Sequence, residues 1–172
     1  MMKMINNFLN RLRTPIPIVD RILEIVAGVC VIALFVTTAI LYNLSPEEVP
    51  THYSFSGEAD EYSGNSFYWL MSGLFFIFML ITYISAYYPN SNSVRLPIRS
   101  KEMTPLQMML VARMTRIINI GLAFLWLDVL LSISASTLNI EWDTIRLINI
   151  SSVIVITIPA IWYTIKIMHN KN

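Results

Sequence analysis

Four long apolar runs constrain the fold of this chain more than any other feature of its sequence. They cover residues 25–44, 66–88, 117–136 and 147–165, and Asp128 is the only charged residue within them. Each run is close to the ~20 residues that an α-helix needs to cross a bilayer. Backbone groups in hydrocarbon must form hydrogen bonds within the protein. We therefore predict an all-α integral membrane protein with four transmembrane helices.

The positions of the basic residues predict the orientation of these helices. Eleven of the twelve Lys and Arg residues lie before the first run, between the second and third, or after the fourth. Cytoplasmic segments of membrane proteins carry an excess of such residues, so both termini should face the cytoplasm. Segments 45–65 and 137–146 should then face outward, and together they hold seven acidic residues and one Arg.

We divide the chain into four parts on this basis. They are a cytoplasmic segment over 1–17, a module of two helices and an outer loop over 18–88, a basic loop and helix start over 89–116, and two further helices with a tail over 117–172. The first part is either a short amphipathic helix on the inner membrane surface or a frayed terminus.

The third and fourth helices carry further local signals. Thr104-Pro105 is typical of the cap and first residue of a helix, so the third helix should begin there, well before its apolar run. Arg113 and Arg116 would then be placed to reach lipid phosphates. Pro159 lies within the fourth run, where we expect it to kink the helix.

The outer loop, residues 45–65, is a polar stretch between two apolar runs. It holds five carboxylates and His52 but no Lys or Arg. Ser45-Pro46 followed by two Glu residues predicts one helical turn, which Pro50 should end. We expect residues 51–55 to be extended and residues 56–58 to form a turn.

A motif within this loop resembles a known family. The motif residues are Pro46, Pro50, Thr51, His52, Gly57, Glu58 and Asp60. With Val49 and Tyr53 they resemble the extracytoplasmic loop of the bacterial DUF1648-type membrane domain, over about residues 25–88. The same module forms the N-terminal part of SdpI-like immunity proteins. The resemblance implies a multi-pass protein of the bacterial cytoplasmic membrane, with a secreted peptide or an envelope protein as its partner.

The loop residues allow three interpretations. His52, Glu58 and Asp60 could supply nitrogen and oxygen ligands to a divalent cation, although one His and unspaced carboxylates are a weak metal signature. The acidic surface could instead attract a cationic partner. A third interpretation is that His52 and Asp60 form hydrogen bonds that order the loop. We expect no cofactor.

Asp128 lies near the middle of the third run, where an ionised carboxylate is costly. It shares a helical face with Gly121 and Ser132, and the fourth run carries a comparable polar stripe at Asn149 and Ser152. Either Asp128 is a neutral acid that forms hydrogen bonds between helices, or it belongs to a proton or cation pathway.

No nucleophile motif, phosphate-binding loop, HExxH or CxxC pattern is present in the sequence, so we do not predict an enzyme. We predict a binding, sensing or immunity-type protein in the lipid bilayer whose acidic loop recognises a cationic or peptide partner. The alternatives are a small proton- or cation-coupled transporter that uses Asp128, and a metal-dependent membrane enzyme. We expect no nucleic acid partner, and the sequence leaves a homo-oligomer open.

Overall fold

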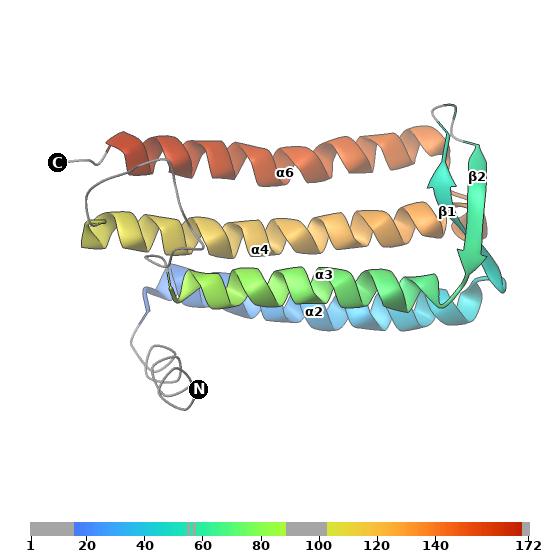
Figure 1. The fold of residues 1–172 in the computed structure, drawn as a ribbon, viewed down its shortest axis with the longest axis horizontal. Helices are drawn as coiled ribbons and strands as arrows, with labels where there is room; N and C mark the ends of the chain where they lie inside the picture. Colours follow the sequence, from blue (N-terminus) through green and yellow to red (C-terminus); the bar gives the residue numbers. More distant parts are fainter. Residues whose placement is uncertain (1–15, 55, 57, 89–102, 170–172) are drawn as a thin grey trace.

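The computed structural model describes residues 16–54, 56, 58–88 and 103–169. Most of the predicted segment over 1–17 and most of the predicted basic loop lie outside this part of the chain. The elements, labelled as in Figure 1, are α2 (Ile18–Leu44), β1 (Glu48–Tyr53), β2 (Ala59–Gly64), α3 (Phe67–Ala86), α4 (Pro105–Ile133), α5 (Ala135–Leu138) and α6 (Trp142–His169). Among the described residues, α2, α3, α4 and α6 are the four helices long and apolar enough to cross a membrane. That part of the prediction is confirmed.

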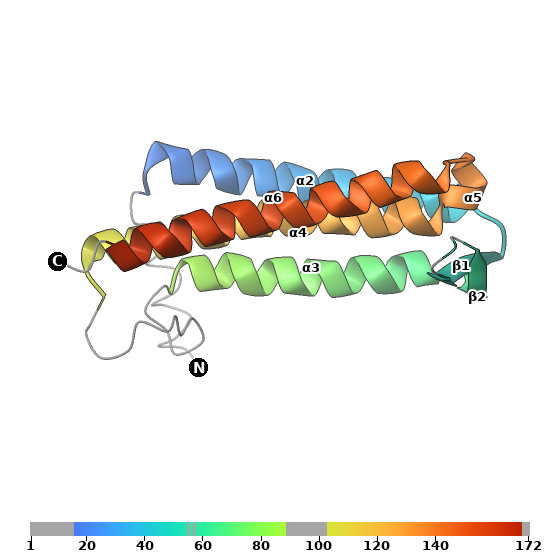
Figure 2. The same ribbon diagram turned by 90° about the horizontal axis from the view of Figure 1, so that it is seen from above.

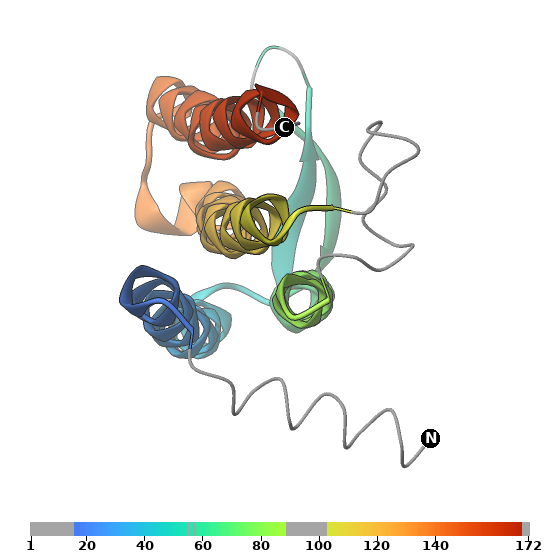
Figure 3. The ribbon, with the colours of Figure 1, turned by 90° about the vertical axis from the view of Figure 1, so that its left-hand side faces the viewer.

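Helix α4 lies at the centre of the bundle. Seen along the helices, α6 packs on one side of α4, and α2 and α3 pack on the other (Figure 3). Buried residues occur along the whole of α4, whereas α6 exposes large apolar side chains such as Leu147, Ile154 and Ile161. In a bilayer these exposed faces would be covered by lipid tails.

The predicted start of the third helix is confirmed. Thr104 Oγ1 accepts a hydrogen bond from the Gln107 backbone at 3.2 Å, and Gln107 Oε1 accepts one from the Thr104 backbone at 2.9 Å. This reciprocal cap, with Pro105 as the first helical residue, satisfies backbone donors that the helix leaves unpaired. Helix α6 begins at Trp142, before its apolar run, and continues through Pro159.

The connection between α2 and α3 is a two-stranded antiparallel hairpin, which crosses the end of the bundle (Figure 1). The predicted helical turn after Pro46 is wrong, because Glu48 begins β1. Ser45 instead ends α2, since its backbone N donates to Leu41 O at 2.9 Å. Val49 and Pro50 are buried while Glu48 and His52 are exposed, so β1 rests on the bundle near its start.

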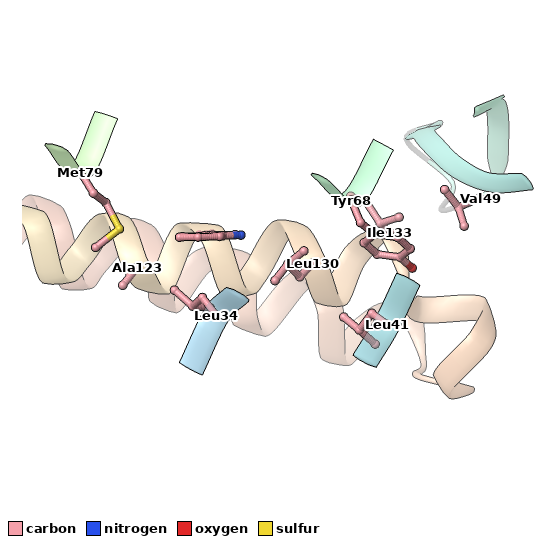
Figure 4. Close-up of a cluster of buried hydrophobic side chains, with 9 residues drawn as sticks. Leu34, Leu41, Val49, Tyr68, Met79, Ala123, Leu130 and Ile133 are labelled. Carbon is pink, nitrogen blue, oxygen red and sulfur yellow. The ribbon is translucent and has the colours of Figure 1, made fainter. Parts of the chain in front are cut away.

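The main hydrophobic core joins α2, α3, α4 and β1 (Figure 4). Its buried members are Leu34, Leu41, Val49, Tyr68, Met79, Ala123, Trp126, Leu130 and Ile133. A second cluster joins α4 to the last turns of α6, and it includes Val111 and Ile167. The hairpin therefore shares a core with three of the helices.

Polar side chains link α2, α3 and α4 within the apolar bundle. Near its middle, Ser72 Oγ lies 2.7 Å from Thr38 Oγ1 and accepts a hydrogen bond from Trp126 Nε1 at 3.0 Å. At the hairpin end, the Tyr68 hydroxyl lies 2.8 Å from Ser45 Oγ and 2.9 Å from Ser134 Oγ. Each of these two sets of hydrogen bonds joins α2, α3 and α4 or the residues that end them.

Ion pairs connect α2 to α4 at the opposite end of the bundle. Arg113 donates from Nε to Asp20 Oδ1 at 2.9 Å and from Nη2 to Asp20 Oδ2 at 3.2 Å. Arg116 donates from Nε to Glu24 Oε1 at 2.8 Å. The predicted contact of these arginines with lipid phosphates is therefore wrong. Asp20 and Arg116 are buried, and a buried charge requires a partner within the protein.

Tyr87 extends this cluster to α3. Its hydroxyl donates to Glu24 Oε1 at 2.7 Å, and the Arg116 guanidinium carbon lies 5.3 Å from the centre of its ring. Glu24 thus accepts hydrogen bonds from both neighbouring helices.

Candidate functional site

The hairpin presents its acidic residues on the surface. Glu47, Glu48, Glu58, Asp60 and Glu61 are all exposed. His52 on β1 reaches Asp60 on β2, with 2.6 Å between His52 Nδ1 and Asp60 Oδ1. The strand register shifts on both sides of His52, and such irregularities redirect side chains. The structure therefore brings together two of the predicted motif residues.

The pKa of His52 is raised above its ordinary value of 6.5. The hydrogen bond with Asp60 is the largest cause, followed by the negative charge of Asp60; Glu61 adds a smaller effect, and burial opposes the shift. A raised pKa in the folded state means that the charged pair stabilises the hairpin fully below the unfolded pKa. This stabilisation is lost as the pH rises through the folded pKa.

The other motif residues have different surroundings. Pro46 is exposed, Pro50 is buried and Thr51 is half-buried. The Glu58 backbone closes the hairpin, because Glu58 O accepts from the Ser54 backbone N at 2.8 Å and Glu58 N donates to Ser54 Oγ at 3.3 Å. Gly57 lies outside the described residues.

The predicted ligand set of His52, Glu58 and Asp60 does not come together. Within the described part of the chain, no three His, Cys, Asp or Glu residues are grouped so that they could hold a metal ion. His52 and Asp60 instead form an exposed pair that joins the two strands.

Two tyrosines hold the hairpin on the bundle, a role that the sequence analysis did not assign to them. Tyr53, at the end of β1, donates from its hydroxyl to Ser132 O at the end of α4, at 2.8 Å. Tyr68 is buried beneath β1, in the core that includes Val49. In the sequence, Tyr53 directly follows His52 and Tyr68 lies near the start of an apolar run. These positions could have suggested the contacts, but tyrosines of an interfacial aromatic belt occupy such positions equally often.

The second predicted site lies between α4 and α6. Asp128 is 5% exposed, and one terminal atom of the Asn149 side chain lies 2.6 Å from both of its carboxyl oxygens. Gly121 allows the two helices to approach here, because a Cβ at this position would collide with Ile156 Cγ1. Ser152 is buried on α6. Ser132 contributes its backbone carbonyl, which accepts from Tyr53.

The contact between Asp128 and Asn149 is compatible with two protonation states of Asp128. An ionised Asp128 would accept hydrogen bonds from the Asn149 amide N at 2.6 Å, which is short for an N–H···O bond. A neutral Asp128 would donate its O–H to the Asn149 carbonyl, and 2.6 Å lies within the range of O–H···O bonds. The short distance and the cost of charge in hydrocarbon both favour the neutral acid.

We predict that removal of the Asp60 charge lowers the pKa of His52. In wild-type protein, an NMR titration of the His52 ring should give a pKa above 6.5. The Asp60→Asn variant should bring it close to that value, whereas Glu47→Gln, at an exposed acid outside the pair, should leave it nearly unchanged. Equal pKa values in the wild type and Asp60→Asn would show that the cross-strand pair does not form.

We also predict that Asp128 is protonated at neutral pH. The infrared difference spectrum between wild type and Asp128→Asn should contain the carbonyl band of a protonated carboxyl group. Asp128→Asn keeps a polar partner for Asn149 and should fold normally, whereas Asp128→Leu should lose roughly 0.6–2 kcal/mol, as for other hydrogen bonds between membrane helices. Ser151→Leu, on an exposed part of α6, is the control. A carboxylate band in place of the carbonyl band would contradict the neutral assignment.

A comparison with protein families finds one match in this chain. Residues 29–76 match the model described as Domain of unknown function (DUF1648). The match covers much of α2, the whole hairpin and the first half of α3. No curated protein and no solved structure matches the chain. The predicted DUF1648-type domain is thereby confirmed over residues 29–76.

Proposed function

We propose that this chain is a multi-pass protein of the bacterial cytoplasmic membrane whose acidic hairpin binds a cationic peptide outside the cell. The observation that carries the proposal is an anchored hairpin with exposed carboxylates. Such binding would serve sensing of the peptide or immunity against it, the role of the SdpI-like proteins that the loop motif resembles.

The charge of the hairpin favours a positive partner. Glu47, Glu48, Glu58 and Glu61 are exposed, and none of them forms an ion pair with another described residue. Segment 45–65 contains no Lys or Arg. Clustered charges of one sign attract an oppositely charged partner and accelerate its association.

The anchoring of the hairpin favours binding because the carboxylates are already positioned. Val49 is fully buried, Tyr53 is bonded to Ser132 O, and the Asn65 backbone N donates to Glu47 O at 2.9 Å. The first two contacts hold β1 on the bundle, and the third closes the base of the hairpin. A preorganised surface loses less conformational entropy when it binds.

The distribution of charge supports an outward-facing hairpin. The half of the bundle opposite the hairpin carries Arg21, Arg113, Arg116 and Lys166, and the cytoplasmic side is the one on which basic residues accumulate. In this orientation the termini are cytoplasmic and the hairpin faces the compartment that a secreted peptide would reach first.

The contact between Asp128 and Asn149 favours a second candidate function, a small proton- or cation-coupled transporter. A buried carboxyl group between two membrane helices is the kind of group that proton relays use. The two candidates make different demands on Asp128. Transport requires a group that titrates, whereas peptide binding requires only that the bundle remain folded.

The peptide proposal predicts a loss of affinity when hairpin charges are removed. A Lys-rich synthetic peptide should bind the protein in zwitterionic nanodiscs, and a triple variant of Glu47→Gln, Glu48→Gln and Glu61→Gln should bind more weakly. At ~0.2–1 kcal/mol for each exposed charge pair, the triple variant should lose affinity by about 3- to 150-fold. Calorimetric titration at two salt concentrations would measure this loss.

Three controls complete this experiment. Glu141→Gln, at an exposed acid before α6, should keep wild-type affinity, as should Asp128→Asn. In cells, Ser56→Cys in a Cys30→Ala background should react with an impermeant thiol reagent from outside. Unchanged affinity in the triple variant, or no labelling of position 56, would refute the proposal. Normal peptide binding with proton flux that Asp128→Asn abolishes would add the transporter function.

A further inference from the structure

A cavity opens between α2 and α3, at the end of the bundle opposite the hairpin. Its volume is about 420 Å³, and its lining includes Arg21, Glu24, Gly28, Phe76, Tyr83 and Asn119. This size lies within the range of ~300–1,000 Å³ typical of small-molecule sites. From Arg21 to Val31 the lining follows α2 for about 15 Å, at 1.5 Å per residue. The cavity is a groove that runs from a helix end into the bundle.

The arrangement of the helices explains the groove. Helices α2 and α3 diverge toward the start of α2 (Figures 2 and 3). The ion pairs of Asp20 and Glu24 with α4 hold this end of α2 against α4. Gly28 adds space, because a Cβ at this position would meet nothing within 4 Å.

Asn119 gives the groove a specific chemical requirement. It lies on α4 at 5% exposure, and its Oδ1 is buried without a hydrogen-bond partner among the described residues. A buried carbonyl oxygen is costly to leave unpaired. Because Oδ1 only accepts hydrogen bonds, a ligand that satisfies it must present an O–H or N–H donor.

The mouth of the groove carries a positive charge. Arg21 is exposed and forms no ion pair with another residue that the structure describes. The nearby carboxylate of Glu24 is already bound by Arg116 and Tyr87. The available charge at the mouth is therefore positive, and it favours an anionic group.

We propose that this groove binds a single-chain anionic lipid with a free hydroxyl next to its head group, that is, a lysophospholipid. Its phosphate would meet Arg21, its hydroxyl would donate to Asn119 Oδ1, and its acyl chain would lie on the apolar wall of Ile25, Val31 and Leu80. The cavity volume is about 420 Å³. That volume suits one acyl chain better than two.

The test measures binding of lysophosphatidic acid to the full-length protein in a neutral detergent, by native mass spectrometry. Wild type should bind one molecule saturably, and should bind the 2-O-methyl analogue, which lacks the donor, about tenfold more weakly. Asn119→Leu should lose this preference and bind both lipids alike. Arg21→Gln should lose the preference for lysophosphatidic acid over zwitterionic lysophosphatidylcholine.

A matched pair of glycine variants tests the location. Gly28→Leu fills the groove and should weaken binding at least tenfold. Gly73→Leu introduces the same side chain on α3, where a Cβ also meets nothing within 4 Å, but Gly73 does not line the groove. It should bind like wild type.

Several results would overturn the proposal. They are the absence of saturable binding, equal binding by Gly28→Leu and Gly73→Leu, or an undiminished preference for the free hydroxyl in Asn119→Leu. The last result would mean that water alone satisfies Asn119. If Gly28→Leu does not fold, the preference measured in Asn119→Leu decides the question.

Discussion

Several polar side chains of α4 have partners on neighbouring helices, because hydrocarbon offers them none. Arg113 and Arg116 bind acids on α2, Trp126 binds Ser72 on α3, and Asp128 contacts Asn149 on α6. Apolar packing alone discriminates poorly among arrangements in a bilayer, since lipid tails are as apolar as the side chains. These directed contacts therefore fix which helices surround α4 and at what depth.

Polar contacts with α4 also support both proposed binding surfaces. At one end, the hydrogen bonds of Tyr68 and Tyr53 with the end of α4 hold the base of the hairpin, so its carboxylates are presented on a fixed support. At the other end, the ion pairs draw α2 toward α4 and leave the groove beside α3. Two separate sets of polar contacts thus position the acidic surface and open the groove.

The sequence predicted those features that depend on local chemistry. Run length and lack of charge identified the four helices, and Thr104-Pro105 identified the start of α4. The hairpin was missed because Ser45-Pro46-Glu47 is a good helix start in isolation, whereas burial of Val49 in the bundle favours a strand. The pairing of Arg113 with Asp20 spans 93 residues, and no local pattern distinguishes it from contact with phosphate. The helical faces of Asp128 and Asn149 could be predicted from their spacing, but the contact between them required the packing of α4 on α6.

The most direct test of this account is a double-mutant cycle on Glu24 and Arg116, measured by reversible unfolding in detergent micelles. Arg116→Met leaves the largely buried carboxylate of Glu24 without its charged partner and should lose about 3–5 kcal/mol. The double variant Glu24→Met, Arg116→Met removes both charges and should be markedly more stable than Arg116→Met. With the single variant Glu24→Met it completes the cycle, whose coupling energy should be about 1–3 kcal/mol. Arg21→Met, at an exposed arginine on α2, should change stability little. Equal effects of Arg116→Met and Arg21→Met, with no coupling in the cycle, would contradict the account.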